Sequence, residues 1–406
     1  MRICHFFIAL VLSLLFQVKA ETLTIGTTLS VDSLQYLIDK WQEEMDGNQV
    51  KTVNRTAMSL ERLLMQPNEV DIIFSSSPIL LYNLKENNKL AILPKKSQQN
   101  NKLIPEYLTQ YAVAVAFSGF GILYNEALLK ERGMNLPTDW QDLLDIKYNG
   151  SVVMSSPSRS GTTHLLIEML LQQQGWKSGW ATILEMSSNL STISSRSFGV
   201  AEKLKSGLVY AGLTIDNYAN LALKNKNLGF QYFPNSIASA TFLAINKNSQ
   251  HKLLAENFID FLLSEDGQKF ISNSNNGKFP VNKLPEDHLL FYQQQRLLDQ
   301  DQINHKLLLE RRLIVEKLFD LAITFRLKQL QDTWNELYKK EEKLGYRLQK
   351  IRDLLTSIPI SESDINQDFL LQIKGDQNFL LKKESEWIYF FQNKNDEAIK
   401  ELGKVN

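Results

Sequence analysis

Cysteine is almost absent from this chain of 406 residues, because Cys4 is the only one. It lies ahead of an apolar run over residues 6–16 that leads to the small residue Ala20. This leader is typical of a secretory signal peptide and is too short for a membrane span, so we expect cleavage after Ala20. The mature protein would then lack disulfides, a thiol nucleophile and thiolate metal ligands.

An excess of either charge is also missing, since 45 Lys and Arg residues balance 45 Asp and Glu residues. Loss of Arg2 and Lys19 with the leader would leave 43 basic residues and a net charge of −2. No broad basic field is left to attract nucleic acid. After the leader no stretch reaches eighteen apolar residues, so we expect no membrane span in the mature chain and a periplasmic location.

Motifs of catalysis are lacking too, because the sequence has no G-x-S-x-G, H-E-x-x-H or P-loop pattern. Of five histidines, only His164 lies beside a hydroxyl-rich loop, and we interpret it as a helix residue that faces solvent or packs within the lobes. The serines and threonines of that loop have no evident general base, so we interpret them as hydrogen-bond donors. We expect binding without catalysis, with no metal and no cofactor.

Short apolar runs alternate with helical periodicity from residue 21 to about 283, which is typical of layered α/β folds. Strands are predicted at residues 23–26, 70–74, 112–117, 151–154, 208–211 and 240–245. Helices are predicted at residues 32–41, 78–85, 162–174, 216–224 and 253–264, the last one stopped by Gly267.

Glycine and proline nearly vanish after Pro285, since residues 286–357 contain only Gly345 and no proline. Apolar residues recur there at spacings of three and four, which predicts a heptad seam interrupted at Glu341. One more helix is predicted at residues 384–391. The seam could fold back as a hairpin, pack on a lobe, or dock onto the sensor part of a membrane kinase. Its members are Ile323, Leu327, Leu330, Trp334, Leu337, Leu344, Leu348, Ile351 and Leu355.

Hydroxyl side chains gather in four segments, at positions typical of loops that follow a strand and precede a helix. In open α/β sheets, ligands bind beyond the carboxyl ends of strands, and a helix N-terminus offers free N–H groups and positive partial charge. Arg159 and Arg196 add planar donors for phosphate or carboxylate, and Gly161 would let a ligand approach the backbone. Each loop alone is explained by helix capping, but four together predict a cage for a small anion. The segments are residues 26–33, 75–78, 155–163 and 194–199.

Three segments together resemble the family 1 bacterial extracellular solute-binding proteins. They are SRSGTTH from residue 158, SFGVAEKLKSGLVYAGLTIDNYA from residue 197, and FPNSIASATFLAINKNSQHKLLAENFIDFLLSEDGQKF from residue 233. The resemblance covers residues 21–283. It implies an α/β, two-lobed periplasmic-binding-protein-like fold of type II that closes on its ligand like a hinge, with crossovers near residues 112–117 and 233–239.

On this basis we divide the chain into a signal peptide, two lobes and a C-terminal α-helical extension that is partly coiled-coil-like. The extension is not typical of family members that feed transporters. It is similar instead to that of a periplasmic member implicated in inducing phosphoglycerate uptake with a membrane two-component system. The boundaries are residues 1–20 for the signal peptide, 21–115 plus 238–283 for lobe one, 116–237 for lobe two and 284–406 for the extension.

The resemblance places the ligand between the lobes. Ferric iron is disfavoured, because the iron-binding branch uses neighbouring tyrosines and the matching segment GLTIDNYAN offers only Tyr218. A small anionic organophosphate such as phosphoglycerate fits the hydroxyl loops better. The expected ligand-binding residues are Thr27, Thr28, Ser30, Ser75, Ser76, Ser77, Arg159, Ser160, Gly161, Thr162, Thr163, Arg196, Ser197, Asp216 and Tyr218.

The resemblance thus implies a periplasmic solute-binding protein that helps to induce organophosphate transport through a membrane signalling system. Its partners would be the small anionic solute and a membrane sensor kinase. One alternative is delivery of a phosphonate, organophosphate or other small solute to an ABC permease. A second is an exported hydrolase that uses a loop serine, and a third is a scaffold with a vestigial cleft. We expect deletion of residues 286–406 to leave ligand affinity intact.

Overall fold

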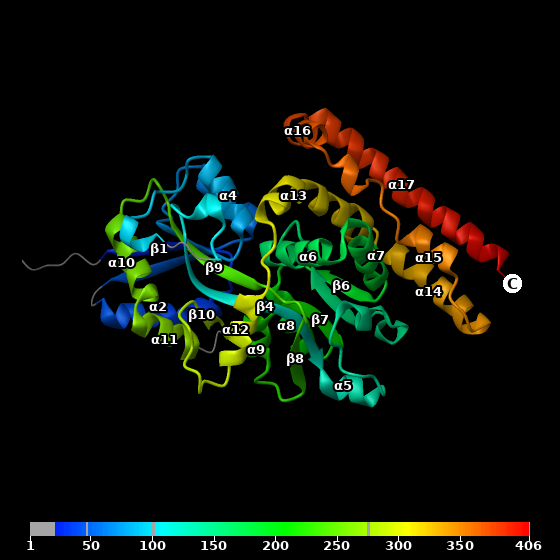
Figure 1. Cartoon of the computed structure of the whole chain (residues 1–406), viewed down its shortest axis with the longest axis horizontal. Coiled ribbons are helices and arrows are strands. Elements are labelled where there is room, and N and C mark those ends of the chain that lie inside the picture. The colour runs from blue at the N-terminus through cyan, green and yellow to red at the C-terminus, as the bar shows by residue number, and fades with distance from the viewer. Residues whose placement is uncertain (1–20, 46–47, 99–101, 274–276, 406) are drawn as a thin grey trace, which may run out of the picture.

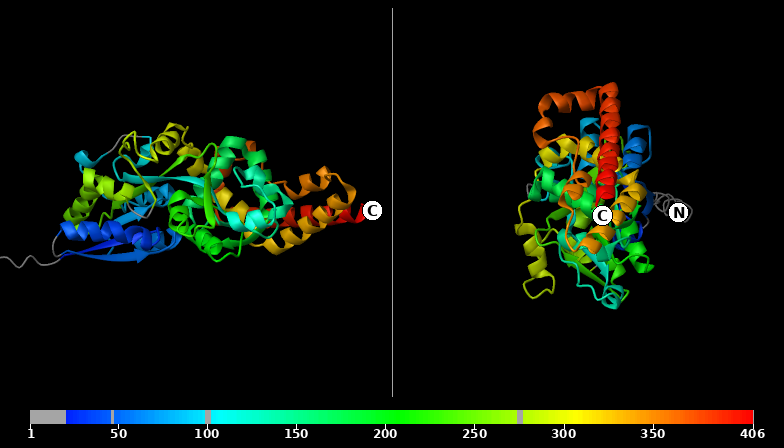
Figure 2. Two further views of the ribbon diagram at one scale, coloured as in Figure 1. Left: turned by 90° about the horizontal axis from the view of Figure 1, so that it is seen from below. Right: turned by 90° about the vertical axis from the view of Figure 1, so that its right-hand side faces the viewer.

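Two α/β lobes and a helical extension follow one another along an elongated molecule (Figures 1 and 2). The computed structural model describes residues 21–45, 48–98, 102–273 and 277–405, so the predicted signal peptide lies outside the described residues. Within these residues the strands form one mixed sheet in the order β2-β1-β3-β9-β4-β7-β5-β6, with β8 and β10 also paired to β4. They are β1 Thr22–Thr27, β2 Gln49–Asn54, β3 Ile72–Ser75, β4 Val113–Asn125, β5 Val152–Ser155, β6 Leu190–Ser194, β7 Ala211–Ile215, β8 Leu228–Tyr232, β9 Ala238–Ile245 and β10 Phe279–Pro280.

Lobe one is built on the parallel pairs β1–β2 and β1–β3, with β9 antiparallel to β3. Alternate side chains of its strands enter two apolar cores on opposite faces of the sheet. Phe74 packs with Trp41 and Phe258 in one core, whereas the adjacent Ile73 packs with Leu80 in the other. The helices are α2 Asp32–Glu44, α10 Lys252–Leu263 and α11 Glu265–Asn273 over the first core, and α3 Ala57–Met65 and α4 Pro78–Glu86 over the second.

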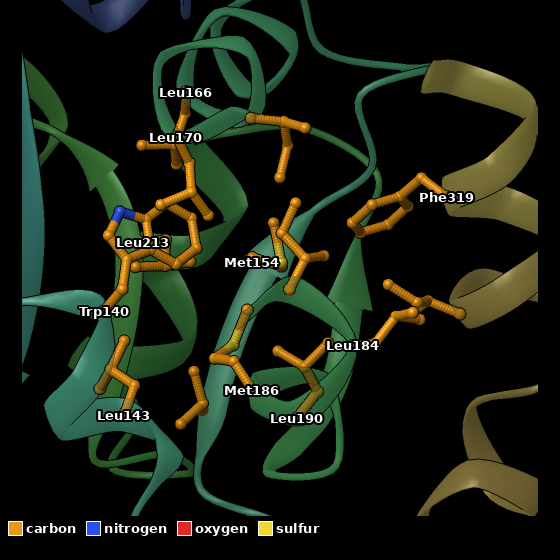
Figure 3. Close-up of a cluster of buried hydrophobic side chains, with 14 of the residues drawn as sticks. Trp140, Leu143, Met154, Leu166, Leu170, Leu184, Met186, Leu190, Leu213 and Phe319 are labelled. Carbon is orange, nitrogen blue, oxygen red and sulfur yellow. The ribbon is translucent and has the colours of Figure 1, made fainter. Parts of the chain in front are cut away.

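Lobe two carries the parallel strands β5, β6 and β7 around one large apolar cluster. Leu166 and Leu170 of α6 lie above Trp140 and Leu213 in that cluster (Figure 3). The helices of this lobe are α5 Glu126–Glu131, α6 Gly161–Gln174, α7 Trp176–Ser187, α8 Phe198–Lys205 and α9 Asp216–Ala222.

Strand β4 connects the lobes. Its residues 113–119 pair with β9, and its residues 120–125 pair with β7 and β8. The sequence predicted that this strand ends at residue 117, which was wrong because glycines interrupt the apolar pattern there. Those glycines allow close packing: a Cβ added to Gly121 would lie 2.2 Å from the carbonyl oxygen of Gln231. The crossover strand β4 therefore extends beyond the end that the apolar pattern predicted.

Two other predicted boundaries near glycine were also wrong. The strand predicted at residues 208–211 is β7, which starts only at Ala211, because Gly207 forms a turn with φ 71° and Leu208 is 68% exposed. Gly267 does not stop a helix but lies within α11. A Cβ on Gly267 would lie 2.0 Å from the carbonyl oxygen of Phe261, so glycine serves there for close packing between α10 and α11.

From α13 onward the extension packs on lobe two and shares its apolar core, whereas Phe291 and Leu297 of α12 are buried in the second core of lobe one. Phe319 of α13 points toward Met154 and Leu184 of lobe two (Figure 3), and Trp334 of α14 belongs to the same buried cluster. Because this core is continuous, we infer that lobe two and the extension from α13 onward move as one body. The helices are α12 Phe291–Asp299, α13 His305–Phe319, α14 Leu327–Leu344, α15 Gln349–Leu355, α16 Gln367–Gly375 and α17 Gln377–Lys404, with a π-helical turn, η5, at Asp320–Thr324.

The predicted heptad seam is divided between short helices. Gly345 adopts the left-handed φ of 75° after α14 and ends it, and α15 begins four residues later. Trp334 and Ile351 of the seam are buried, and α17 packs against both α14 and α15. The helix predicted at residues 384–391 is the centre of α17, which has 28 residues. The seam therefore combines two expected outcomes, a folded-back hairpin and packing on a lobe.

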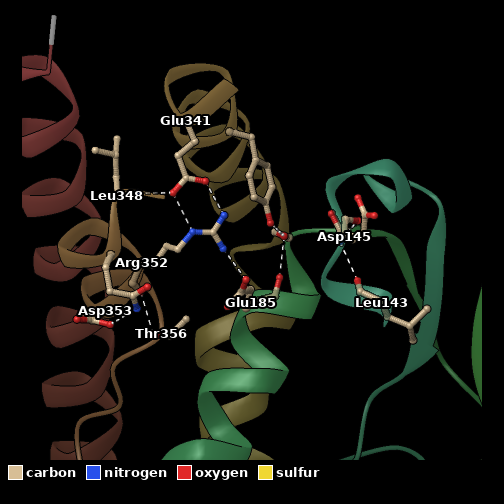
Figure 4. Close-up of polar contacts among 12 residues, drawn as sticks. Leu143, Asp145, Glu185, Glu341, Leu348, Arg352, Asp353 and Thr356 are labelled. Carbon is tan, nitrogen blue, oxygen red and sulfur yellow. Dashed lines mark hydrogen bonds and ion pairs between the residues drawn. The ribbon is translucent and has the colours of Figure 1, made fainter. Parts of the chain in front are cut away.

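Two buried arginines fasten the extension to lobe two. Arg311 of α13 is 1% exposed and donates to both carboxylate oxygens of Glu168 on α6, at 2.8 to 3.1 Å. Arg352 of α15 donates to Glu341 of α14 and to Glu185 of α7 (Figure 4). Each arginine pairs with two glutamates, Arg311 also with Glu362. Glu168 is fully buried and pairs with Arg311, so loss of Arg311 would leave its carboxylate uncompensated.

We predict that Arg311→Met lowers the free energy of unfolding by about 3–5 kcal/mol, because it strands the Glu168 carboxylate in the core. The double variant Arg311→Met/Glu168→Met should recover much of this loss. Lys328→Met is a control that breaks an exposed ion pair with Asp332, and it should unfold like the parent protein. Denaturant titration measures all four proteins, and an unchanged midpoint for Arg311→Met would contradict this role.

His164 makes stability depend on pH. Burial, with the charges of Arg312 and Arg311, lowers its pKa to about 3, against about 6.5 in an unfolded chain. The unfolding free energy that buried, neutral His164 contributes is therefore complete above pH 6.5. It is lost as the pH falls toward 3, by about 1.4 kcal/mol per pH unit. Between pH 7.5 and pH 5, His164→Gln should lose about 2 kcal/mol less unfolding free energy than the parent. Equal losses in denaturant titrations would count against this assignment.

Candidate functional site

Hydroxyl-rich loops from both lobes meet around one small cavity of about 20 Å³. Lobe one contributes the loop after β1 and the starts of α3 and α4, and lobe two contributes the starts of α6, α8 and α9. Leu29, Thr56 and Ala57, which the sequence did not single out, complete the lining. The predicted ligand-binding residues that line the cavity are Thr28, Ser77, Arg159, Ser160, Gly161, Thr162, Arg196, Ser197 and Tyr218.

Three of these helix N-termini carry side-chain caps. Ser77 and Ser160 are the N-caps of α4 and α6, and each hydroxyl accepts a backbone N–H bond at 3.2 Å, from Leu80 and Thr163 respectively. Thr56 caps α3 in the same way. The remaining N–H groups of each first turn and their positive partial charge favour an anion at this place.

The lobes touch where Gly161 faces Ser77. A Cβ added to Gly161 would lie 2.4 Å from the Ser77 Oγ, so a larger residue would push the loops apart. The glycine therefore sets the closeness of the two lobes. Arg159, beside it, is exposed at the rim of the cavity.

Arg196 of lobe two reaches across to lobe one. Its guanidinium donates to the Asn54 Oδ1 at 2.6 Å and to the carbonyl oxygens of Thr28 and Arg55 at 2.9 and 3.0 Å. The same group lies 4.7 Å from the ring centre of Phe198. Burial lowers the pKa of Arg196. These bonds connect the lobes directly, so the structure is closed at this point.

Tyr218 lies against the same junction. Burial raises its pKa. The interactions that oppose this rise most are a hydrogen bond with the Ser197 hydroxyl, the charge of Arg196 and a hydrogen bond with the Ser30 backbone. Ser30 belongs to lobe one, so Tyr218 makes a second polar link between the lobes.

Six predicted residues lie around the cavity without lining it, and Ser30 is the first of them. Three others support the lobe-one loops: Thr27 Oγ1 donates to the Phe74 carbonyl at 2.8 Å, Ser75 bonds Thr28, and Ser76 bonds Thr241. Thr163 bonds Ser155 beneath the start of α6. Asp216 lies deeper, at the crossover strands. These side chains lie next to the cavity and hold its loops in place.

Asp216 and Lys278 form a buried polar network at the crossover. The Asp216 Oδ2 accepts from the Gly119 N–H at 2.7 Å and from the Tyr232 hydroxyl at 3.0 Å. Lys278 donates to Thr241 Oγ1 at 3.0 Å. Burial raises the pKa of Asp216, and this is partly offset by the hydrogen bonds from Gly119 and Ser118 and by the charge of Lys278. Burial lowers the pKa of Lys278. Gly119 lies on β4 and Thr241 on β9, so the network ties the two crossover strands together.

The described residues contain no group of three or more His, Cys, Asp or Glu side chains that could hold a metal ion. In the same part of the chain, no helix combines the length and apolarity needed to cross a bilayer.

Comparison with known proteins agrees with this architecture. Residues 69–306 match the model of the bacterial extracellular solute-binding protein family. The chain is 46% identical, over 391 residues, to the phosphoglycerate transport regulatory protein PgtC of Salmonella typhimurium and to that of Salmonella typhi, covering 96% of this chain and 98% of each relative.

Solved structures show the same fold. The periplasmic binding protein AfuA from Actinobacillus pleuropneumoniae, with fructose-6-phosphate bound, superposes with a TM-score of 0.65 at 18% identity, over 75% of this chain and 98% of AfuA. A substrate binding protein of an ABC transporter from Agrobacterium tumefaciens gives 0.62 at 16% identity, over 75% and 96%. The predicted two-lobed periplasmic-binding-protein fold with a helical extension is confirmed, and the chain belongs to the bacterial extracellular solute-binding protein family.

Proposed function

We propose that this protein binds a small anionic organophosphate such as phosphoglycerate between its lobes and acts in inducing transport of that solute. The observation that carries the proposal is the interlobe cavity bordered by three capped helix N-termini, hydroxyl side chains and two arginines. These groups are donors, and a phosphate offers several acceptor oxygens and negative charge. The relationship to a phosphoglycerate transport regulatory protein supports the same ligand class.

Binding would require the lobes to separate. A cavity of about 20 Å³ has room for about one water molecule, so a phosphate ester must displace the contacts of Arg196 and Gly161. The ligand would then bridge the lobes in their place. Charge-assisted hydrogen bonds contribute about 1.5–3 kcal/mol each, and three or four of them, after ordering costs, correspond to about micromolar affinity.

The movement would take place about the crossover strands. We propose residues 21–115 plus 238–283 as lobe one, 116–237 as lobe two and 284–406 as the extension. Because the extension from α13 onward shares the core of lobe two, this part would follow that lobe when ligand binds and present the change to a membrane sensor kinase. We also propose export to the periplasm with cleavage after Ala20, which the family and its periplasmic relatives support.

Delivery to an ABC permease is the second candidate, because the fold is shared with a transporter's substrate binding protein. Both functions need the same ligand site and differ in the partner. An uptake test with the transporter expressed constitutively separates them. Deletion of the gene should then leave phosphate-ester uptake intact if the function is regulatory, and should abolish uptake if the protein delivers the solute.

We predict that Arg159→Gln weakens binding of 3-phosphoglycerate about tenfold to a hundredfold, because it removes one charge-assisted contact with the phosphate. Isothermal titration calorimetry gives the dissociation constants. Arg132→Gln, which makes the same charge change at the exposed end of α5, is the matched control and should bind like the parent. Absence of any heat with 3-phosphoglycerate, 2-phosphoglycerate and phosphoenolpyruvate would refute the proposed ligand class.

A hydrolase should be distinguishable at the same site. We predict no release of inorganic phosphate from these esters, because the Ser160 hydroxyl is engaged as a cap and the neighbouring His164 is buried with a pKa of about 3. Turnover that disappears in Ser160→Ala would overturn this prediction and favour an exported hydrolase.

A further inference from the structure

A second cavity adjoins the first and is closed on one side by the extension. Its walls are the starts of α3 and α4, residues 157–161 at the start of α6, and Arg312 and Glu316 of α13. Figure 1 shows α13 beside α4 of lobe one and α6 of lobe two. Ala57, Ser77, Arg159, Ser160 and Gly161 line both cavities. The contact of Ser77 with Gly161 lies between them, so parting the lobes would join the two spaces.

Arg312 is held on the lobe-two side of this space. Its Nε donates to the Glu316 Oε1 at 2.9 Å, and the same oxygen lies 3.6 Å from the His164 Nδ1 on α6. The adjacent Arg311 is buried in its ion pair with Glu168. The Arg312 side chain remains 29% exposed. It is thus fixed relative to the N-terminus of α6 while part of it stays accessible.

The charges of the two cavities differ. The first combines arginines, hydroxyls and helix N-termini, which suits a phosphate. The second has both signs, with Arg159 and Arg312 against Glu61 of lobe one and Glu316. Such a lining fits a ligand whose non-phosphate end carries both a hydroxyl and a carboxylate. The hydroxyl can donate to a glutamate of the cavity, and the carboxylate can accept from an arginine guanidinium. A ligand whose non-phosphate end is a polyol has no carboxylate to pair with Arg312.

We infer that Arg312 is a ligand-binding residue supplied by the extension, and that the site selects phosphorylated hydroxy acids. The phosphate occupies the first cavity and the carboxylate meets Arg312 in the second. This inference rests on the proposed function and names the feature that sets its specificity. It also changes the expectation from sequence, because the extension becomes part of the binding site instead of a separable tail.

The test compares two ligands that differ in one group. Glycerol 3-phosphate keeps the phosphate and hydroxyl of 3-phosphoglycerate but lacks the carboxylate. The parent should bind 3-phosphoglycerate at least tenfold more tightly, measured by calorimetry. In Arg312→Gln this preference should disappear through weaker binding of 3-phosphoglycerate, while the affinity for glycerol 3-phosphate stays within twofold. Arg312→Lys should restore part of the preference.

Arg347→Gln is the matched control, because it removes an exposed arginine of the extension outside both cavities. It should keep the parent's preference. If Arg312→Gln weakens both ligands equally, or neither, the residue is structural and the inference is wrong while the proposed function stands. If the parent binds no phosphate ester at all, the proposed function fails and the inference fails with it.

Discussion

The gathering of hydrogen-bond donors from both lobes around one small space is the constraint on which the site depends. Arg196 satisfies lobe-one carbonyl oxygens, and the N-termini of α3, α4 and α6 face the same small space. Hydrogen-bond donors and positive partial charges brought together in this way are stable only if acceptors lie among them. In the closed structure the protein's own carbonyl and amide oxygens fill that role. A bound anion would take it over, so ligand and lobe closure compete for the same donors.

The extension is coupled to this site by packing. Phe319 enters the core of lobe two, and the Arg311–Glu168 pair fixes α13 to α6, whose N-terminus borders the cavity. A second link is the Ser156 hydroxyl, which donates to Asp320 just beyond α13 at 2.9 Å. Because apolar cores are dense and resist deformation, a shift of the start of α6 must also move α13. Signalling through the extension would therefore need no long relay, only a rigid connection from ligand loop to helix.

Much of this arrangement could be predicted from the sequence, for a physical reason. Hydroxyls at the ends of strands β1, β3, β5 and β6 mark helix starts, and strands of one sheet bring those starts to one edge. Thr28, Ser77 and Ser160 accordingly line one cavity. The same pattern does not separate a hydroxyl that faces the cavity from one that supports the loop. Thr27 and Ser76 differ from their neighbours only in direction, which pleating and tertiary hydrogen bonds decide.

Residues that reach the site from distant segments could not be predicted. Thr56 follows a strand, β2, whose mixed polar sequence gives little signal. Lys278 and Arg312 lie in segments without a motif, and only the fold brings them to the crossover and the second cavity. The most direct test of the account is a crystal structure grown with 3-phosphoglycerate. It should show the phosphate bound by backbone N–H groups at the start of α6, between separated lobes. A phosphate on any other surface, with the interlobe cavity unchanged, would contradict it.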